Sequence, residues 1–304
     1  MLPVLGIFAA VLLLAAAALW VAILVNGPAV LDAVDRSSGG ARKVELVESA
    51  PYGTQPTQKL GYYAPADTRN RLPVLIFFHG GSWQSGDPDN YGFIARALAP
   101  EGFIVVVAGY RLGEEGRYPA MLQDTAAAIA QVRSDVGRFG GDPDRIVLSG
   151  HSAGAYNVVQ VAVDQRWLHE AGVPQSSIKG VAGLSGPYDF YPFASEATKL
   201  MFGTVGAGPE SQPINHARSN LAPMLLIHGE DDTLVKPRNT HALAAAISEA
   251  GARVETQFYP EMDHNKPLIS LASPWRDSAG IAVRIAKFAH RVTDVSVPVQ
   301  AERP

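Results

Sequence analysis

The chain has 304 residues, 47% of them hydrophobic, and a formal net charge of −4. This length suits one large domain or two small ones with a substantial core. The slightly acidic balance argues against a nucleic-acid partner, which would require a basic face. The absence of cysteine excludes disulfides, thiolate metal ligands and cysteine nucleophiles.

The amino-terminal run 2–25 contains no charged or strongly polar side chain. As a helix it would be about 36 Å long, enough to cross a hydrocarbon core of about 30 Å. We therefore predict a single-pass transmembrane anchor over residues 1–26. The alternative is a cleaved signal peptide and a secreted protein, but a signal peptide has a basic segment before a shorter apolar run. No Lys or Arg precedes this run.

Residues 27–42 are rich in Gly, Ser and Asp, and we predict that they form a flexible linker. Basic residues after the span would keep the following domain cytoplasmic. Asp32 and Asp35 are interleaved with them, so both orientations stay open. The basic residues are Arg36, Arg42 and Lys43.

From residue 43 onward, strand-like runs alternate with helical patterns. We predict strands at 44–47, 60–64, 74–78, 103–108, 146–149, 181–184, 224–227 and 254–259, the last near an edge. We predict helices at 90–99, 119–139, 155–163, 242–249 and 279–291. This order predicts an α/β domain over 43–292, built on a doubly wound, mostly parallel sheet. Residues 293–304 are predicted to be a loose tail.

Residues 186–220 stand out as a long irregular connection rich in Gly, Pro and aromatic residues. Long connections in compact domains are often lids or binding loops. We expect this insert to shape a substrate pocket.

The predicted chemistry centres on Gly150-His151-Ser152-Ala153-Gly154, a Gly-x-Ser-x-Gly motif between a predicted strand and a predicted helix. A nucleophilic serine at such a turn is strained, and the chain passes very close on both sides, which the two glycines permit. Ser152 would stand at the amino end of a helix, where the helix dipole favours negative charge. The alternative is a Gly/Ser-rich loop that merely ends a strand.

A serine hydroxyl becomes an effective nucleophile when a histidine, oriented by a carboxylate, accepts its proton. In hydrolases that carry the nucleophilic serine on such a strand-to-helix turn, known as the nucleophile elbow, the chain order is serine, carboxylate, histidine. Asp231 and Asp232 follow one predicted strand, and His264 follows the next. We predict His264 as the general base and Asp232, in preference to Asp231, as its partner. Each of them could instead be an ordinary loop residue.

Acyl transfer also needs backbone donors that are already in place for the oxyanion. We predict these donors to be the amides of Ala153, directly after the nucleophile, and of Gly80 and Gly81, directly after a buried strand. The predicted pocket residues are Trp83, Tyr110 and His151. For Trp83 and Tyr110 the alternative is a place in the core.

Taken together, the motifs resemble the α/β-hydrolase superfamily over residues 55–292. The matching segments are His79-Gly80-Gly81-Ser82-Trp83, Gly86-Asp87, Gly109-Tyr110-Arg111-Leu112, residues 139–146, residues 150–154, His228-Gly229 with Asp232 and Val235, and His264. Ser82 and His151 differ from the hormone-sensitive-lipase pattern, so the chain is most similar to the His-Gly-Gly-x-Trp esterase branch. That branch contains carboxylesterases, acetyl-xylan or feruloyl esterase-like proteins and kynurenine formamidase-like enzymes. Gly109 stands where these esterases usually have Asn or Asp.

The resemblance implies a serine hydrolase that cleaves a carboxylic ester through an acyl-enzyme on Ser152. An arylformamidase-type amide hydrolase is one alternative, and a non-catalytic binding protein on the same fold is another. The expected partners are a small-molecule ester and, through the amino-terminal helix, a membrane. No cofactor and no metal are expected, because the histidines lack metal-ligand spacing.

Overall fold

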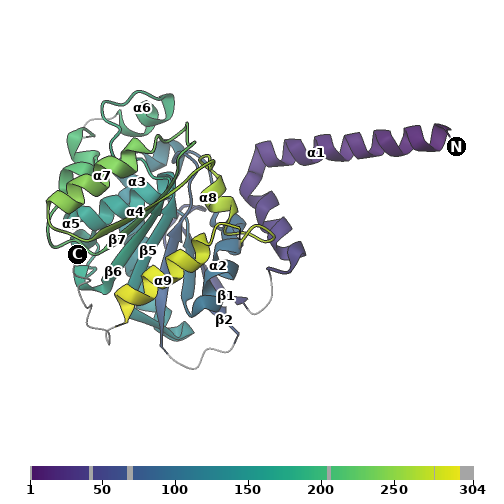
Figure 1. Ribbon diagram of the computed structural model, residues 1–304. Coiled ribbons are helices and arrows are strands. Elements are labelled where there is room, and N and C mark those ends of the chain that lie inside the picture. Colours follow the sequence, from purple (N-terminus) through teal and green to yellow (C-terminus); the bar gives the residue numbers. More distant parts are fainter. Residues whose placement is uncertain (1, 41–43, 67–70, 204–206, 277, 295–304) are drawn as a thin grey trace, which may run out of the picture.

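The computed structural model describes residues 2–40, 44–66, 71–203, 207–276 and 278–294 (Figure 1). Within these residues an eight-stranded sheet has the order β1-β2-β4-β3-β5-β6-β7-β8. The strands are β1 (Val44–Pro51), β2 (Lys59–Pro65), β3 (Leu72–Phe78), β4 (Ile104–Ala108), β5 (Gly141–His151), β6 (Ile178–Leu184), β7 (Met224–Gly229) and β8 (Val254–Tyr259). The pairs β1–β2 and β2–β4 are antiparallel, and all the pairs from β4 to β8 are parallel.

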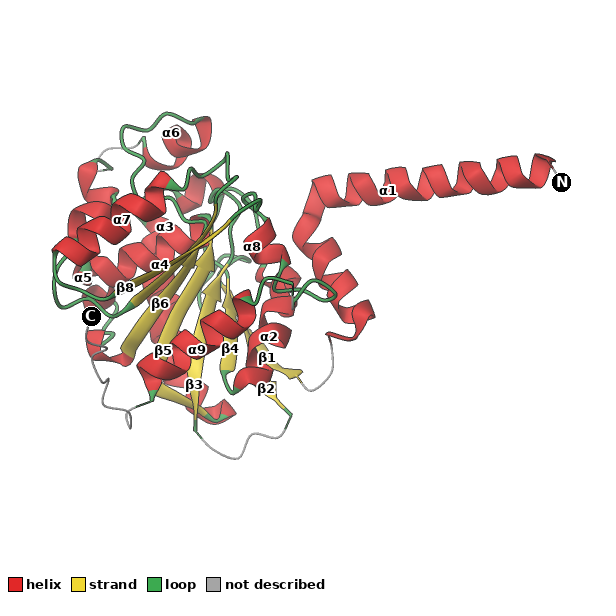
Figure 2. Ribbon diagram, viewed as in Figure 1, coloured by secondary structure: helices red, strands yellow, loops and turns green. Residues whose placement is uncertain are grey.

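Helices cover both faces of this sheet (Figures 1 and 2). They are α2 (Gly92–Leu98), α3 (Ala120–Asp135), α4 (Ala153–Val163), α5 (Gln165–Glu170), α6 (Glu196–Phe202), α7 (Arg238–Glu249), α8 (Lys266–Ile269) and α9 (Ile281–Thr293). One core contains residues of α3, α4, α5 and α7, and the other contains residues of α2, α8 and α9. The predicted doubly wound α/β fold is therefore confirmed, with β8 at an edge as expected.

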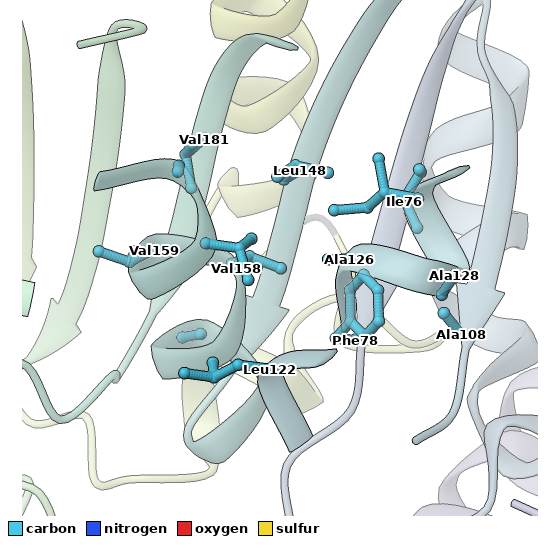
Figure 3. Packing of buried hydrophobic residues seen from close by; sticks show 14 of the residues in the cluster. Ile76, Phe78, Ala108, Leu122, Ala126, Ala128, Leu148, Val158, Val159 and Val181 are labelled. Carbon is cyan, nitrogen blue, oxygen red and sulfur yellow. The ribbon is translucent and has the colours of Figure 1, made fainter. Parts of the chain in front are cut away.

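The two faces of β3 show why its sequence is apolar throughout. Ile76 and Phe78 point into the core with α3 and α4, whereas Leu75 and Phe77 point into the opposite core. Figure 3 shows side chains of the sheet facing Leu122 and other residues of these helices. Complete burial of each such side chain stabilises the fold by about 1.5–3 kcal/mol. This packing makes the strand ends that carry the site rigid.

Helix α1 (Leu2–Asp35) consists of two arms joined by a kink. Asn26 has φ −152° and ψ 74°, and Pro28 lies just beyond it. The side chain of Asn26 accepts a hydrogen bond of 3.1 Å from the amide of Ala29, which caps the second arm. The first arm projects away from the domain (Figure 1). The stretch Ala16–Gly39, which includes the end of this arm and the kink, is long and apolar enough to cross a membrane, a test that a signal sequence also passes.

The second arm of α1, residues 27–35, lies against the domain. Asp35 is fully buried and forms ion pairs of 2.5 Å with Arg96 of α2 and 2.6 Å with Arg276. Asp32 is also buried and pairs with Arg96. The prediction of a flexible linker is wrong for residues 27–35, because these aspartates form buried ion pairs with distant arginines.

The insert at 186–220 is less irregular than predicted. It contains α6 and two 3-10 turns, Pro209–Ser211 and Pro213–His216. The helices α5 and α8 are also absent from the predictions, because each has fewer than seven residues and too little periodicity to identify. The predicted tail lies outside the described residues from 295 onward.

Candidate active site

Ser152 occupies a sharp turn between β5 and α4. Its φ of 54° and ψ of −119° are strained for a residue with a side chain. A Cβ on Gly154 would lie 2.1 Å from the carbonyl oxygen of Phe78, and one on Gly150 would lie 2.5 Å from the carbonyl carbon of Gly154. The Ser152 amide donates a 2.8 Å hydrogen bond to the carbonyl of Leu184 in β6. The turn therefore requires both glycines, as the motif predicts.

Ser152, His264 and Asp232 form one hydrogen-bonded chain. His264 Nε2 lies 2.8 Å from Ser152 Oγ, and His264 Nδ1 lies 2.7 Å from Asp232 Oδ2. A neutral His264 with its proton on Nδ1 donates to Asp232 and accepts from the serine hydroxyl. The three residues follow β5, β7 and β8, and these strands belong to the parallel part of the sheet, so their carboxyl ends lie at one edge. Asp231, by contrast, is exposed.

Asp232 is surrounded by donors. Its Oδ1 accepts hydrogen bonds from the amides of Leu234 (3.0 Å) and Val235 (2.8 Å). Burial opposes ionisation of Asp232, but hydrogen bonds from His228 and His264 outweigh burial and lower the pKa of the carboxyl below its ordinary value. Asp232 is therefore a carboxylate at neutral pH and can hold one tautomer of His264.

His228, at the end of β7, supports this carboxylate and was not among the predicted site residues. Its Nε2 donates to the carbonyl of Val235 at 2.8 Å and lies 3.2 Å from Asp232 Oδ2. Its Nδ1 lies 2.7 Å from the hydroxyl of Thr240. The sequence contains one signal for it, a histidine at a strand end four residues before the aspartate.

His151 is buried beside the elbow and holds the loop that carries His264. Its Nε2 donates to the backbone carbonyl of His264 at 2.9 Å. Burial, reinforced by the nearby His264 ring, lowers the pKa of His151 to about 3. His151 is thus a neutral donor, and its side chain also lines the cavity in front of Ser152.

The predicted oxyanion donors lie around Ser152. A Cβ on Gly80 would lie 3.1 Å from the Cβ of Ser152, and Gly80 and Gly81 line the same cavity as Ser152. Ala153 is the first residue of α4, so its amide has no acceptor within the helix. Their role as donors stays a prediction.

The predicted pocket residues Tyr110 and Trp83 have different positions. Tyr110 is fully buried, stacks on His79 at 4.8 Å between ring centroids, and donates a 3.0 Å hydrogen bond to the His79 carbonyl. Its predicted place in the pocket is wrong, because the ring packs beneath the loop that carries Gly80. Trp83 does line a cavity, and its Nε1 donates to Asn157 at 3.0 Å.

Comparison with known proteins identifies the family. Residues 60–247 match the sequence model of the BD-FAE family. The chain belongs to the BD-FAE family. The predicted place in an esterase branch of the α/β-hydrolase superfamily is confirmed.

Two curated relatives show how far the similarity of this BD-FAE protein extends. It is 29% identical to the isoprenylcysteine alpha-carbonyl methylesterase of Arabidopsis thaliana over 72% of this chain and 56% of that protein. It is 26% identical to the kynurenine formamidase of Salmo salar over 78% of this chain and 79% of that protein. The chain therefore spans little more than half the length of the methylesterase.

A solved structure supports the same fold. Esterase B from Lactobacillus rhamnosis superposes with a TM-score of 0.73 at 22% identity, over 86% of this chain and 91% of that one. At this identity the likeness concerns the fold alone.

Two cavities of this BD-FAE protein meet at Ser152. The first, of about 520 Å³, also touches the kink of α1, and we call it the anchor-side cavity. The second, of about 360 Å³, is walled by Trp83, Phe190 and Tyr191, and we call it the insert-side cavity. Leu234 borders both of them. An ester bond placed at Ser152 could therefore direct its acyl and alcohol parts into different cavities.

Proposed function

We propose that this BD-FAE protein is a serine hydrolase that cleaves a carboxylic ester through an acyl-enzyme on Ser152. His264 is the general base and acid, and Asp232 orients it. One observation carries the proposal, the buried chain of hydrogen bonds of 2.8 Å and 2.7 Å that joins Ser152, His264 and Asp232. A serine with this partner can lose its proton as it attacks.

The reaction would proceed in two halves. Ser152 Oγ bonds to the carbonyl carbon while its proton moves to His264 Nε2, and the carbonyl electron pair becomes an oxyanion facing the amides of Gly80, Gly81 and Ala153. When the oxyanion collapses, the bond to the alcohol breaks and His264 returns the proton to the leaving oxygen. Water then repeats the sequence on the acyl-enzyme and releases the acid.

The experiment is covalent labelling of the full chain, in detergent, with a fluorophosphonate probe, followed by peptide mass mapping. We expect one adduct on Ser152, which is lost in Ser152→Ala and strongly slowed in His264→Ala. His241→Ala is the matched control, since His241 is an exposed histidine on α7. A folded protein without any adduct would refute the proposal.

Amide cleavage is the second candidate activity, because the relative named kynurenine formamidase is matched over 79% of its length. The same residues would cleave an N-formyl aromatic amine by the same steps. Turnover of an aryl ester and of an N-formyl aromatic amine, measured on one preparation, separates the two activities. We expect the ester to be the better substrate, since resonance with the nitrogen makes an amide carbonyl less electrophilic than an ester carbonyl.

We also propose that residues 1–26 remain attached as a membrane anchor, ahead of a hydrolase domain that extends to residue 292. The alternative is that the same helix acts as a signal sequence and is removed. If the anchor stays attached, the buried Asp32 and Asp35 of the second arm hold its carboxyl end against the domain. An intact mass in the membrane fraction would agree with the anchor, and a shortened chain in the medium would refute it.

A further inference from the structure

The anchor-side cavity has one wall that does not belong to the hydrolase domain. The kink of α1 supplies this wall, and Ser152 and His264 line the same cavity. The wall residues are Leu24, Val25, Asn26, Gly27 and Pro28. Leu268 of α8 borders the same cavity, in agreement with the position of the kink near α8 in Figure 1. Any molecule that fills this cavity in front of Ser152 therefore contacts the end of the apolar arm.

The position of this wall is fixed by charge pairing. Asp35 Oδ1 accepts hydrogen bonds from the amide of Ser273 at 2.7 Å and from Arg276 at 2.6 Å, and Asp35 Oδ2 pairs with Arg96 at 2.5 Å. Asp35 is completely buried. Removal of Arg96 or Arg276 would leave this buried charge only partly compensated, which is costly. The kink is therefore held in place relative to Ser152 rather than hanging from a loose tether.

The position of the cavity relative to a membrane follows from the proposed anchor. If the first arm crosses a bilayer, its last apolar residues lie at the membrane surface, at the kink of α1. Leu24 and Val25 are 64% and 80% exposed, so the domain does not cover them and lipid can. The cavity is also lined by the polar residues Asp87 and Asn90, which suit the headgroup layer. The cavity thus opens where hydrocarbon meets water.

We infer that the substrate is a membrane-resident amphiphile, an ester whose long hydrocarbon acyl chain stays in the bilayer beside Leu24 and Val25 while its carbonyl reaches Ser152 through the anchor-side cavity. This inference rests on the proposed function and the proposed anchor. A chain that stays in the bilayer does not expose its hydrocarbon surface to water during binding, which would be unfavourable. The alcohol part of the ester then occupies the insert-side cavity.

The test uses the full chain in phosphatidylcholine nanodiscs with two substrates that share one leaving group, umbelliferyl palmitate in the bilayer and umbelliferyl acetate in solution. Gly27→Trp narrows the cavity from the α1 side, and the site tolerates a side chain because a Cβ there meets no atom within 4 Å. Val21→Trp is the matched control, since Val21 is exposed on the same arm and Val21 does not line the cavity.

We expect Gly27→Trp to lower kcat/KM for the palmitate by about tenfold or more and to change the value for the acetate by less than about twofold. Val21→Trp should leave both values unchanged. Loss of both activities in equal measure, an unchanged palmitate rate, or a wild-type protein that cleaves only the acetate would overturn the inference and leave the proposed function standing. Failure of both esters together with failure of Ser152 to take the fluorophosphonate would instead refute the proposed function.

Discussion

The two cavities beside Ser152 differ in the elements that form their walls. The kink of α1 closes the anchor-side cavity, and aromatic residues of the insert, such as Phe190 and Tyr191, close the insert-side cavity. Ser152 borders both of them. The proposed catalytic residues therefore follow strands of the sheet, whereas the walls that select the substrate come from the kink of α1 and from the insert.

The two walls are also held by different forces. Ion pairs of Asp32 and Asp35 hold the second arm of α1. In the insert, Phe202 of α6 contacts Trp83 and Phe190, with ring centroids 4.9 Å and 5.1 Å apart. Removal of one charge should therefore disturb the anchor side, while shortening of an aromatic side chain should disturb only the insert side.

The largest expected effect is a loss of activity toward every ester, whichever cavity its acyl part fills. Asp232→Asn keeps the shape of the side chain but removes the charge that selects the tautomer of His264, so we expect kcat to fall by about 10⁴. The fall should be the same for esters that fill either cavity. Asp231→Asn, one residue away and exposed, should retain full activity. Steady-state kinetics on umbelliferyl acetate and palmitate measure both variants, and a loss confined to one ester would contradict a shared role.

The fold and the groups around Ser152 were predictable because local sequence encodes them. Apolar runs such as 74–78 indicate strands buried on both faces, and parallel strands bring their carboxyl ends to one edge. Residues directly after those strands, including Ser152, Asp232 and His264, must then lie near one another. Their order along the chain, serine then aspartate then histidine, each after a predicted strand, was sufficient to favour them as the catalytic residues.

The docked arm of α1 was not predictable from local sequence. Asp32 and Asp35 lie in a segment whose composition is typical of a solvated linker. Their partner Arg96 lies more than 60 residues away on α2. A buried ion pair between distant elements leaves no periodic signal. Tyr110 was misplaced for a related reason, because a motif position does not say on which side of a loop the ring lies.

The second prediction separates the anchor side from the insert side. Arg96→Met removes the cation between two buried aspartates, and we expect the second arm of α1 to be destabilised by about 3–5 kcal/mol. Arg36→Met is the matched control, because Arg36 also pairs with Asp32 but its side chain is 60% exposed, so the cost should be about 0–1 kcal/mol. Hydrogen exchange of residues 27–35 reports the docking. Equal protection in both variants would contradict the role given to Arg96.

The third prediction concerns His151, a titratable residue in the wall of the anchor-side cavity. Burial lowers its folded-state pKa from 6.5 to about 3. Between these values the unfolded chain binds a proton that the folded chain does not, so the free energy of unfolding decreases as the pH falls, by about 1.4 kcal/mol per pH unit from this residue.

His151→Gln keeps a donor for the His264 carbonyl and removes the titration. Urea unfolding in detergent between pH 4.5 and 6 should then show a slope that is smaller by about that amount. Asp232 acts in the same sense, because its pKa is also lowered in the folded protein, but the resulting loss of stability as the pH falls occurs below its ordinary pKa of 3.8, outside this window. An unchanged slope would mean that His151 is protonated in the folded protein.

The smallest expected effect belongs to the insert side. Tyr191 is 47% exposed and lines only the insert-side cavity, so Tyr191→Ala should weaken the hold on an aromatic alcohol by about 1 kcal/mol, roughly fivefold in kcat/KM. Leu200→Ala, at a residue on α6 that is 41% exposed and lies outside both cavities, should have no effect.

Because both umbelliferyl esters place the same alcohol in that cavity, Tyr191→Ala should slow them equally, whereas Gly27→Trp should slow only the palmitate. Sites that act on opposite ends of the ester contribute independently, so in the double variant the two free-energy changes should add for the palmitate. If Tyr191→Ala instead slows only the palmitate, the acyl chain occupies the insert-side cavity, and the roles of the two walls are exchanged.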